Sequence, residues 1–489
     1  MAVRVLLAQA LFCNSSECLI NKTISSFREV NIHNMSKNQK NSVMRVKDMT
    51  QGNPVKLIIA FAIPLFVGNI FQQIYNMVDT MVVGYGLGDS AIAAIGATTT
   101  LYNLVVNFAW ALNNGYGIVV TQRFGAGDEK TMKKAIAGMI ELDIAVTVIL
   151  SLLALVFLHP LMKFMNIPEA IFAQAYTYIF IIYAGMITTI AYNMFAGILR
   201  AMGNSRSPLY FLIASSVLNV VLDVLLVLVI PLGVAGAAVA TVIAQAVSAI
   251  LCGAYVFKHY GKYMPEKEDY KVPKEVIADL FTTGVAMALM ITVIDLGSLI
   301  FQRANNVYGE MIITAHAAAR RIITMFMAPI STISTANATF IGQNWGAKKI
   351  ERIRTTMKKV LGIEVLWAVF SAVLMYLLGD TMVRFVTGTD DAEVIKNAVM
   401  SIRIHFSCYP ALGILVCLRN AMQAMGRKAA PVISSCIELG MKIFAALWLI
   451  PHFGFLGTCV TEPVTWVLMM IFLVVVYITQ RDKMFGITV

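Results

Sequence analysis

The sequence predicts an all-α membrane protein of twelve transmembrane helices, built as two six-helix lobes that a pseudo-twofold axis along the membrane normal relates. Three observations predict this fold. Hydrophobic residues make up 58% of the 489 residues and charged residues 13%, with a mean hydropathy of +0.75, whereas a soluble domain carries about 25% charged residues. Long apolar runs recur along the chain, and the second half of the sequence repeats features of the first.

The apolar runs are each long enough to cross a hydrocarbon core, which takes about 20 residues of helix. They lie near residues 57–78, 92–119, 135–158, 171–193, 208–230, 234–257, 276–302, 311–340, 360–378, 397–421, 431–450 and 455–479. These runs do not alternate polar and apolar residues as barrel strands do. Helices are therefore expected, because a helix satisfies its own backbone hydrogen bonds in lipid.

The internal repeat consists of short motifs that return in the same order some 221 residues later. Thr121–Gly127 is echoed by Gly342–Lys348, Ala201–Gly203 by Ala424–Gly426, and Ile230–Pro231 by Ile450–Pro451. Six helices per half return the chain to the same side, so both halves share one orientation. In a membrane protein, such a duplication indicates a transporter whose path runs between the halves.

The boundaries follow from these runs. We expect an N-lobe over 51–257, a basic linker over 258–275, a C-lobe over 276–480 and a tail over 481–489. Residues 1–50 are polar beyond a short apolar stretch, which suits a disordered extension or a start-site artefact with Met35 or Met44 as the true start.

Basic residues fall overwhelmingly on one side of the predicted helices. The connections after even-numbered helices, with residues 45–56 before the first helix and residues 481–489 at the C-terminus, hold 25 Lys and Arg residues, against four on the opposite side: Lys163, Arg303, Arg384 and Lys396. The positive-inside rule therefore places both termini in the cytoplasm. The net charge of +11 is mostly this asymmetry, so a nucleic-acid partner is not expected.

The sequence shows no motif that is typical of an enzyme. It contains no phosphate-binding loop, no zinc-ligand spacing and no Ser/His/Asp pattern. Five of the cysteines lie in apolar runs, where a free thiol behaves as a small hydrophobic group. We expect a protein that is not an enzyme and that carries no cofactor other than a coupling ion.

Carboxylates within the spans are the main candidates for function, because a charged group in a bilayer is costly and usually faces a wet cavity or a partner. Asp223 lies in the middle of the fifth run, with Asn219 one turn earlier on the same face. Together they resemble half of a proton or small-cation site. Asp79 ends the first run, where the alternative is a carboxylate that caps a turn at Gly84–Gly88.

These motifs resemble the MATE (multidrug and toxic compound extrusion) transporters, in the bacterial branches that include DinF and NorM. The resemblance covers roughly residues 50–480 and is carried by four motifs: Val78–Gly84, Gln122–Gly127 with its echo Thr339–Ala347, Leu199–Gly203 with Pro208, and Pro231–Thr241. It implies two six-helix lobes and export of amphipathic cations in exchange for protons or sodium.

The resemblance also implies a coupling site. DinF-like members build an N-lobe site from side chains that match Asp79, Tyr178, Asn219, Asp223 and Thr241 here. The alternative for Tyr178 and Thr241 is a packing role, and Asn219 with Asp223 would be the ligands if the ion is Na⁺. NorM-like members add acids on the seventh and tenth helices, where this chain has Asp295, displaced by one position, and Leu412. Because the NorM-like acids are not matched in the C-lobe, we expect the coupling site to lie in the N-lobe and the coupling ion to be a proton.

The C-lobe carries further intramembrane charges. Glu438 and Lys442 are spaced for an i,i+4 ion pair. Arg320 and Arg321 either face a cavity between the lobes, as Asp295 would, or extend to the membrane surface. Arginines in the cavity would suit an anionic or zwitterionic substrate.

We therefore expect a secondary antiporter of the bacterial cytoplasmic membrane that exports drugs or metabolites by alternating access. Its partners would be small molecules and the lipid bilayer, and it would work as a monomer. Two alternatives stay open. One is a flippase for lipid-linked oligosaccharide or peptidoglycan precursors from the same superfamily, which should show fourteen spans and a strongly basic cavity. The other is a membrane scaffold that transports nothing.

Overall fold

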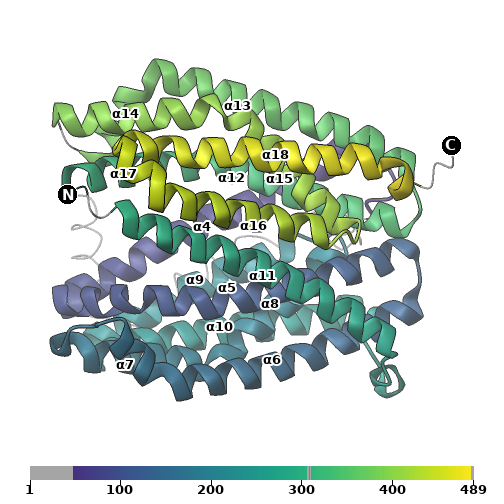
Figure 1. Cartoon of the computed structure of the whole chain (residues 1–489). Coiled ribbons are helices and arrows are strands. Elements are labelled where there is room, and N and C mark those ends of the chain that lie inside the picture. The colour runs from purple at the N-terminus through teal and green to yellow at the C-terminus, as the bar shows by residue number, and fades with distance from the viewer. Residues whose placement is uncertain (1–47, 306–307, 309, 389, 486–489) are drawn as a thin grey trace, which may run out of the picture. The chain divides into compact units, whose positions relative to one another are not determined.

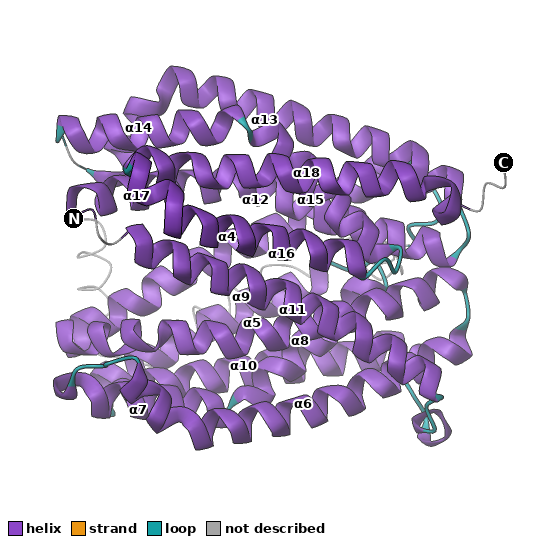
Figure 2. Ribbon diagram, in the orientation of Figure 1, coloured by secondary structure: helices purple, strands orange, loops and turns teal. Residues whose placement is uncertain are grey.

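The computed structural model describes residues 48–305, 308, 310–388 and 390–485. Regular structure within these residues is helical throughout (Figure 2). Ten helices are long and apolar enough to cross a membrane, and each of two bent helix pairs forms one further span, which brings the number to twelve in the described part of the chain. The predicted fold class is confirmed. Residues 1–47 of the expected N-terminal extension lie outside the described residues.

The first lobe contains the helices of the N-terminal half. They are α4 (Pro54–Leu87), α5 (Asp89–Ala126), α6 (Glu129–Phe164), α7 (Glu169–Ala184), α8 (Met186–Ala201), α9 (Arg206–Asp223) with the π-helical turn η1 (Val224–Val229), and α10 (Val234–Tyr260). The segment that leads to the second lobe includes two short 3₁₀ turns, η2 (Gly261–Tyr263) and η3 (Lys267–Tyr270).

The second lobe repeats this order. Its helices are α11 (Lys274–Asn305), α12 (Glu310–Gly346), α13 (Ile350–Thr387), α14 (Ala392–Ser407), α15 (Tyr409–Ala424), α16 (Ala429–Phe444) with the π-helical turn η5 (Ala445–Leu449), α17 (Ile450–Phe453) and α18 (Phe455–Phe485). In Figure 1 the green and yellow helices α12–α18 lie on one side of α11, and the blue helices α5–α10 lie on the other.

The fourth and tenth spans are not the continuous helices that the apolar runs predict. The chain bends by 45° between α7 and α8, at Gly185, and by 52° between α14 and α15, at Cys408. Pro410 lies at the start of α15 and offers no N–H to the helix before it. The two breaks are 223 residues apart, and the turns η1 and η5 begin 221 apart. The duplication therefore extends to local backbone irregularities.

The first helix of each lobe crosses to the other lobe. α4 packs on α9 of its own lobe and on α12, and α11 packs on α16 of its own lobe and most extensively on α5. A Cβ atom on Gly115 of α5 would lie 2.5 Å from the Cα of Gly284 on α11, so the two backbones touch. Small residues permit such close packing of helices in a membrane.

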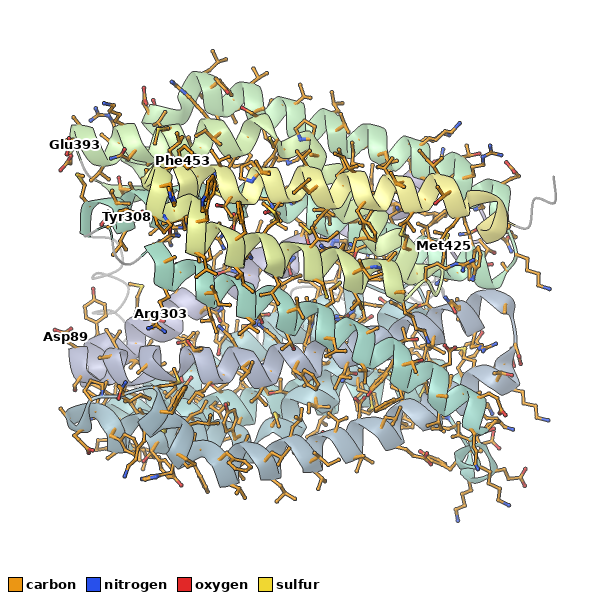
Figure 3. All side chains as sticks on the ribbon, in the orientation of Figure 1. Asp89, Arg303, Tyr308, Glu393, Met425 and Phe453 are labelled. Atoms are coloured by element: carbon orange, nitrogen blue, oxygen red, sulfur yellow. The ribbon has the colours of Figure 1, made fainter. Side chains whose placement is uncertain are left out.

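One end of the helices carries most of the basic residues, and we call it the basic end. It is where α5 and α12 finish and where α6 and α13 begin. Figure 3 places Met425 at this end and Asp89 and Glu393 at the opposite one. The turn at Met425 uses Gly426 at φ +77°, and its counterpart uses Gly203 at φ +80°, a left-handed conformation that glycine adopts without strain.

The repeated Gln-x-x-Gly motifs meet at the basic end and join the lobes. The amide nitrogen of Gln122 donates to the Ala424 carbonyl at 2.8 Å, and that of Gln343 donates to the Ala201 carbonyl at the same 2.8 Å. A Cβ on Gly125 would collide with the Gln343 carbonyl oxygen, and one on Gly346 with that of Gln122. The echo in the sequence is thus a pair of equivalent contacts that hold this end closed.

Residues 48–50, the Met49 segment, reinforce this closure. The Met49 amide donates to the Gln343 side-chain oxygen at 2.8 Å, and the Met49 carbonyl accepts from Asn344 at 3.1 Å and from Arg352 at 3.2 Å. The Met49 side chain is 1% exposed. The packed structure therefore includes residues 48–50, the three residues before the N-lobe boundary expected from the sequence.

Candidate functional site

Two carboxyl groups meet inside the first lobe. Asp79 lies on α4, and Asp223 is the last residue of α9, directly before the π turn η1. The two side chains are in contact, and Asp223 is fully buried while Asp79 is partly buried. Among the described residues, neither oxygen of Asp223 meets a hydrogen-bond donor, and no ion pair includes either acid. Two adjacent carboxylates repel when both are charged, so binding of a proton or a cation between them would relieve the repulsion.

Aromatic hydroxyl groups surround this pair. Tyr178 of α7 lies close to both acids, and Tyr75, one turn before Asp79 on α4, lies against the Thr241 hydroxyl of α10. Thr241 itself donates to the Ala237 carbonyl at 3.1 Å. The structure therefore brings together Asp79, Tyr178, Asp223 and Thr241. Sequence reasoning missed Tyr75, although its i,i+4 spacing to Asp79 on one helix face was a signal.

Asn219 lies one turn before Asp223 on α9 and is 1% exposed. Neither its side-chain oxygen nor its nitrogen has a hydrogen-bond partner among the described residues. A buried amide without hydrogen-bond partners is costly, so the Asn219 side chain is a candidate ligand for a bound ion or molecule. Its oxygen and the Asp223 carboxylate are the kind of hard ligands that Na⁺ takes.

The capping alternative for Asp79 is wrong. Helix α4 does not end at residue 78 but continues to Leu87, so Gly84 and Gly86 are helical and only Gly88, at φ +80°, leaves the helix. Asp79 is therefore an interior residue of a membrane-spanning helix. The apolar run ended early in the sequence only because Asp79 and Thr80 interrupt it.

In the second lobe, Asp295 of α11 faces the other lobe. Its carboxylate accepts a 3.5 Å hydrogen bond from Asn107 of α5, and Lys442 and Glu438 of α16 are its charged neighbours. The predicted i,i+4 pair between Glu438 and Lys442 is confirmed at 2.9 Å, and Lys442 also donates to Ser298 at 2.9 Å. Asp295 and this pair form a compensated charge network beside the lobe interface.

The two arginines of α12 differ in their surroundings. Arg320 forms an ion pair with Glu462 of α18, and 43% of its side chain is exposed. Arg321 points to an exposed face of the helix. The structure thus does not bring Arg320 or Arg321 to Asp295 in one site. Leu412, where an acid was sought, is 3% exposed in the core of the second lobe.

Sequence reasoning also missed an equivalent pair of buried acids. Asp143 of α6 accepts from Asn113 of α5 at 2.9 Å, and Glu364 of α13 accepts from Ser334 of α12 at 2.7 Å. Both acids and both partners are 221 residues apart, which the repeat could have revealed. In each acid the second oxygen is buried without a hydrogen-bond partner among the described residues.

Comparison with known proteins decides the family. The model of the MatE family matches residues 64–225 and 281–448, which is one match in each lobe. The chain belongs to the MatE family. The resemblance seen in the sequence is confirmed. This MatE chain has twelve spans in its described part and two equivalent lobes, and its relatives include proteins named for multidrug resistance.

Among curated proteins, the chain is similar to the probable multidrug resistance protein YpnP of Bacillus subtilis. They are 27% identical over 399 residues, which is 81% of this chain and 88% of YpnP. The multidrug export protein MepA of Staphylococcus aureus is 22% identical over 404 residues, 82% of this chain and 88% of MepA.

Solved structures share the fold. A MATE crystal structure in a bent conformation superposes with a TM-score of 0.82 at 20% identity, over 90% of this chain and 97% of that one. A transporter of the MOP superfamily from Pyrococcus furiosus, described as having a binding pocket of reversed polarity, superposes with a TM-score of 0.80 at 20% identity, over 90% and 98%.

Proposed function

We propose that this MatE protein is a secondary antiporter that exports amphipathic, often cationic compounds in exchange for protons. It works as a monomer in the bacterial cytoplasmic membrane, with the basic end and both termini in the cytoplasm. The observation that carries the proposal is the contact between Asp79 and Asp223, which have no counter-charge among the described residues. A site of this kind can bind either a proton or a cationic group, and competition between the two couples their movements.

The geometry supports a simple cycle. With the basic end closed by Gln122 and Gln343, the cluster at Asp79 and Asp223 receives a proton from the outer side. Protonation removes the negative charge that holds a cationic substrate, so the substrate leaves outward. Opening of the basic end then lets the proton leave to the cytoplasm, where a new substrate binds the recharged pair.

The test is ethidium transport by everted membrane vesicles, in which export by the protein appears as uptake into the vesicle, driven separately by a proton gradient and by a sodium gradient. Asp223→Asn keeps the size of the side chain and removes its charge, and Asp380→Asn, at an exposed position of α13, is the matched control. We expect proton-driven efflux that Asp223→Asn abolishes and Asp380→Asn leaves intact.

Other outcomes have clear meanings. Sodium-driven efflux that Asp223→Asn abolishes would make Na⁺ the coupling ion, with Asn219 as a second ligand. Efflux at full rate in Asp223→Asn would overturn the assigned site. Absence of ethidium transport under both gradients, in protein that folds, would direct attention to precursor flipping.

A further inference from the structure

We propose that the second lobe holds its own proton-binding site, at the Nε2 atom of His405 where it faces Glu462. The site is separate from the acids of the first lobe. Its existence follows from geometry alone, and only its role in transport rests on the proposed antiport.

The position of this site repeats that of the first-lobe cluster. Tyr178 is the tenth residue of α7 and Ser401 the tenth of α14, and Thr241 is the eighth residue of α10 and Glu462 the eighth of α18. These pairs are 223 and 221 residues apart, as the duplicated helices are. The duplication has therefore kept a polar cluster at one place in both lobes while changing its chemistry.

The imidazole of His405 has only one arrangement of protons that suits its surroundings. Its Nδ1 atom lies 2.7 Å from the Ser401 carbonyl oxygen, which can only accept, so Nδ1 carries a hydrogen. In the neutral ring Nε2 is then an unprotonated acceptor. It lies 3.6 Å from the Glu462 carboxylate, which is also an acceptor, and it has no hydrogen-bond partner among the described residues.

A single proton resolves this mismatch. A proton on Nε2 would lie between the imidazole and the carboxylate and would turn two facing acceptors into a charge-assisted hydrogen bond. His405 is 1% exposed, and its ring packs edge-on against Trp466 at 5.6 Å, so it cannot rotate freely to another partner. The site is thus built for one proton.

The charges around His405 allow it to gain and lose that proton. From α12, Arg320 pairs with Glu462 and His316 lies nearby; from α16, Lys442 is a more distant neighbour of Glu462. On α13, Tyr376 bonds Ser407 of the same helix as His405, and Arg403 stacks on that tyrosine. Glu462 favours a proton on Nε2, whereas the neighbouring cations oppose it. The Arg320 side chain is 43% exposed, so the cluster is not fully enclosed by the second lobe.

The role of the site follows from this balance. Before proton uptake, the charges of Arg320 and Glu462 cancel and the imidazole of His405 is neutral. Proton uptake at His405 therefore gives the cluster a net positive charge. Protonation at Asp79 and Asp223 likewise removes negative charge from the first lobe. Both lobes therefore become less attractive to a cationic substrate at the same step, which would sharpen its release.

The first experiment tests the site without transport. The chain has six histidines, so histidine-selective ¹⁵N labelling of the full-length protein in micelles gives a spectrum that His405→Gln can assign. We expect the neutral ring of His405 to be the Nδ1–H form, and its Nε2 atom to take up a proton reversibly as the pH is lowered. A His405 ring that stays neutral down to pH 5 would overturn the proposal.

A paired variant identifies Glu462 as the partner. Glu462→Gln alone would leave Arg320 unpaired, so it is combined with Arg320→Gln, which keeps the cluster neutral. We expect the His405 midpoint to fall by about one pH unit, a tenfold loss of proton affinity. An unchanged midpoint would show that the carboxylate does not hold the proton. If the double variant does not fold, the wild-type titration still decides whether the site exists.

The second experiment tests the role, by proton-driven ethidium efflux between pH 5.5 and 8.5. His452→Gln is a matched control, because its Nδ1 lies 2.7 Å from the carbonyl four residues earlier, as in His405, but the residue is exposed. We expect His405→Gln to shift the pH midpoint of efflux by about one unit, and His452→Gln to leave the profile of the wild type unchanged. A profile like that of His452→Gln would refute the role, whereas loss of all efflux in wild type would refute the proposed function instead.

Discussion

Replacing Gly125 by alanine should open the basic end of the protein. A Cβ at this position would lie 2.5 Å from the Cα of Gln343 and closer still to its carbonyl oxygen. The colliding atoms belong to backbone and cannot rotate away, so the lobes must separate. Overpacking of this kind costs about 1–3 kcal/mol, and the cost falls only on the closed form.

The free-energy cost in the closed form changes the populations of the closed and open forms. A difference of about 1–3 kcal/mol shifts the balance between closed and open forms by roughly 5- to 150-fold. Spin labels at Lys130 and Lys348, which are exposed on either side of the basic end, would report the change by pulsed electron paramagnetic resonance. We expect the longer distance to gain population in Gly125→Ala and likewise in Gly346→Ala.

Gly117 supplies the control on the same helix, because a Cβ there would meet nothing within 4 Å. Gly117→Ala should keep the wild-type distances and stabilise α5 by up to about 1 kcal/mol through helix propensity. Equal distance distributions for Gly125→Ala and Gly117→Ala would refute the view that this contact closes the basic end.

Three further predictions concern hydrogen bonds and charges. Gln343→Leu should open the basic end more than Gln122→Leu in the same resonance assay. It removes two hydrogen bonds of about 0.5–1.5 kcal/mol each, whereas Gln122→Leu removes one. Equal effects of the two variants would contradict this reasoning. Lys442→Met should destabilise the second lobe by less than the roughly 3–5 kcal/mol lost when a fully buried ion pair is broken, since Glu438 loses its partner at 2.9 Å but keeps Arg419 at 3.9 Å, and thermal unfolding would measure the loss. The side chain and amide of Thr131 hold the pKa of Asp128 below its ordinary value. This cap on α6 should therefore be intact above about pH 4 and lost as the pH falls through the lowered pKa of Asp128. Amide exchange in the first turn of α6 should accelerate at that pH, and in Asp128→Ala it should already be fast at neutral pH.

Periodicity and composition predicted the fold because the bilayer imposes a length on every span. They could not predict the breaks at Gly185 and Cys408, which interrupt helices without interrupting hydrophobicity. The same limit applied to Asp79, where a polar pair of residues ended the apolar run but not the helix.

The candidate site was only partly accessible from the sequence. Asp223 and Asn219 could be found because polar groups in a span are costly, whereas Tyr178 and Thr241 came from a family resemblance alone. The role of each remains a prediction. His405 was overlooked because a single histidine in an apolar helix carries no pattern, and its meaning depends on Glu462, which lies 57 residues further along the chain and meets it only in the folded lobe.

The attachment of the Met49 segment has a consequence for how the chain is made. Its hydrogen bonds reach residues that lie 294 to 303 positions later in the sequence. During synthesis the helices of the first lobe can enter the membrane and pack while those partners do not yet exist. The Met49 segment is therefore among the last of the described parts to reach its final place, once α12 and α13 have left the ribosome.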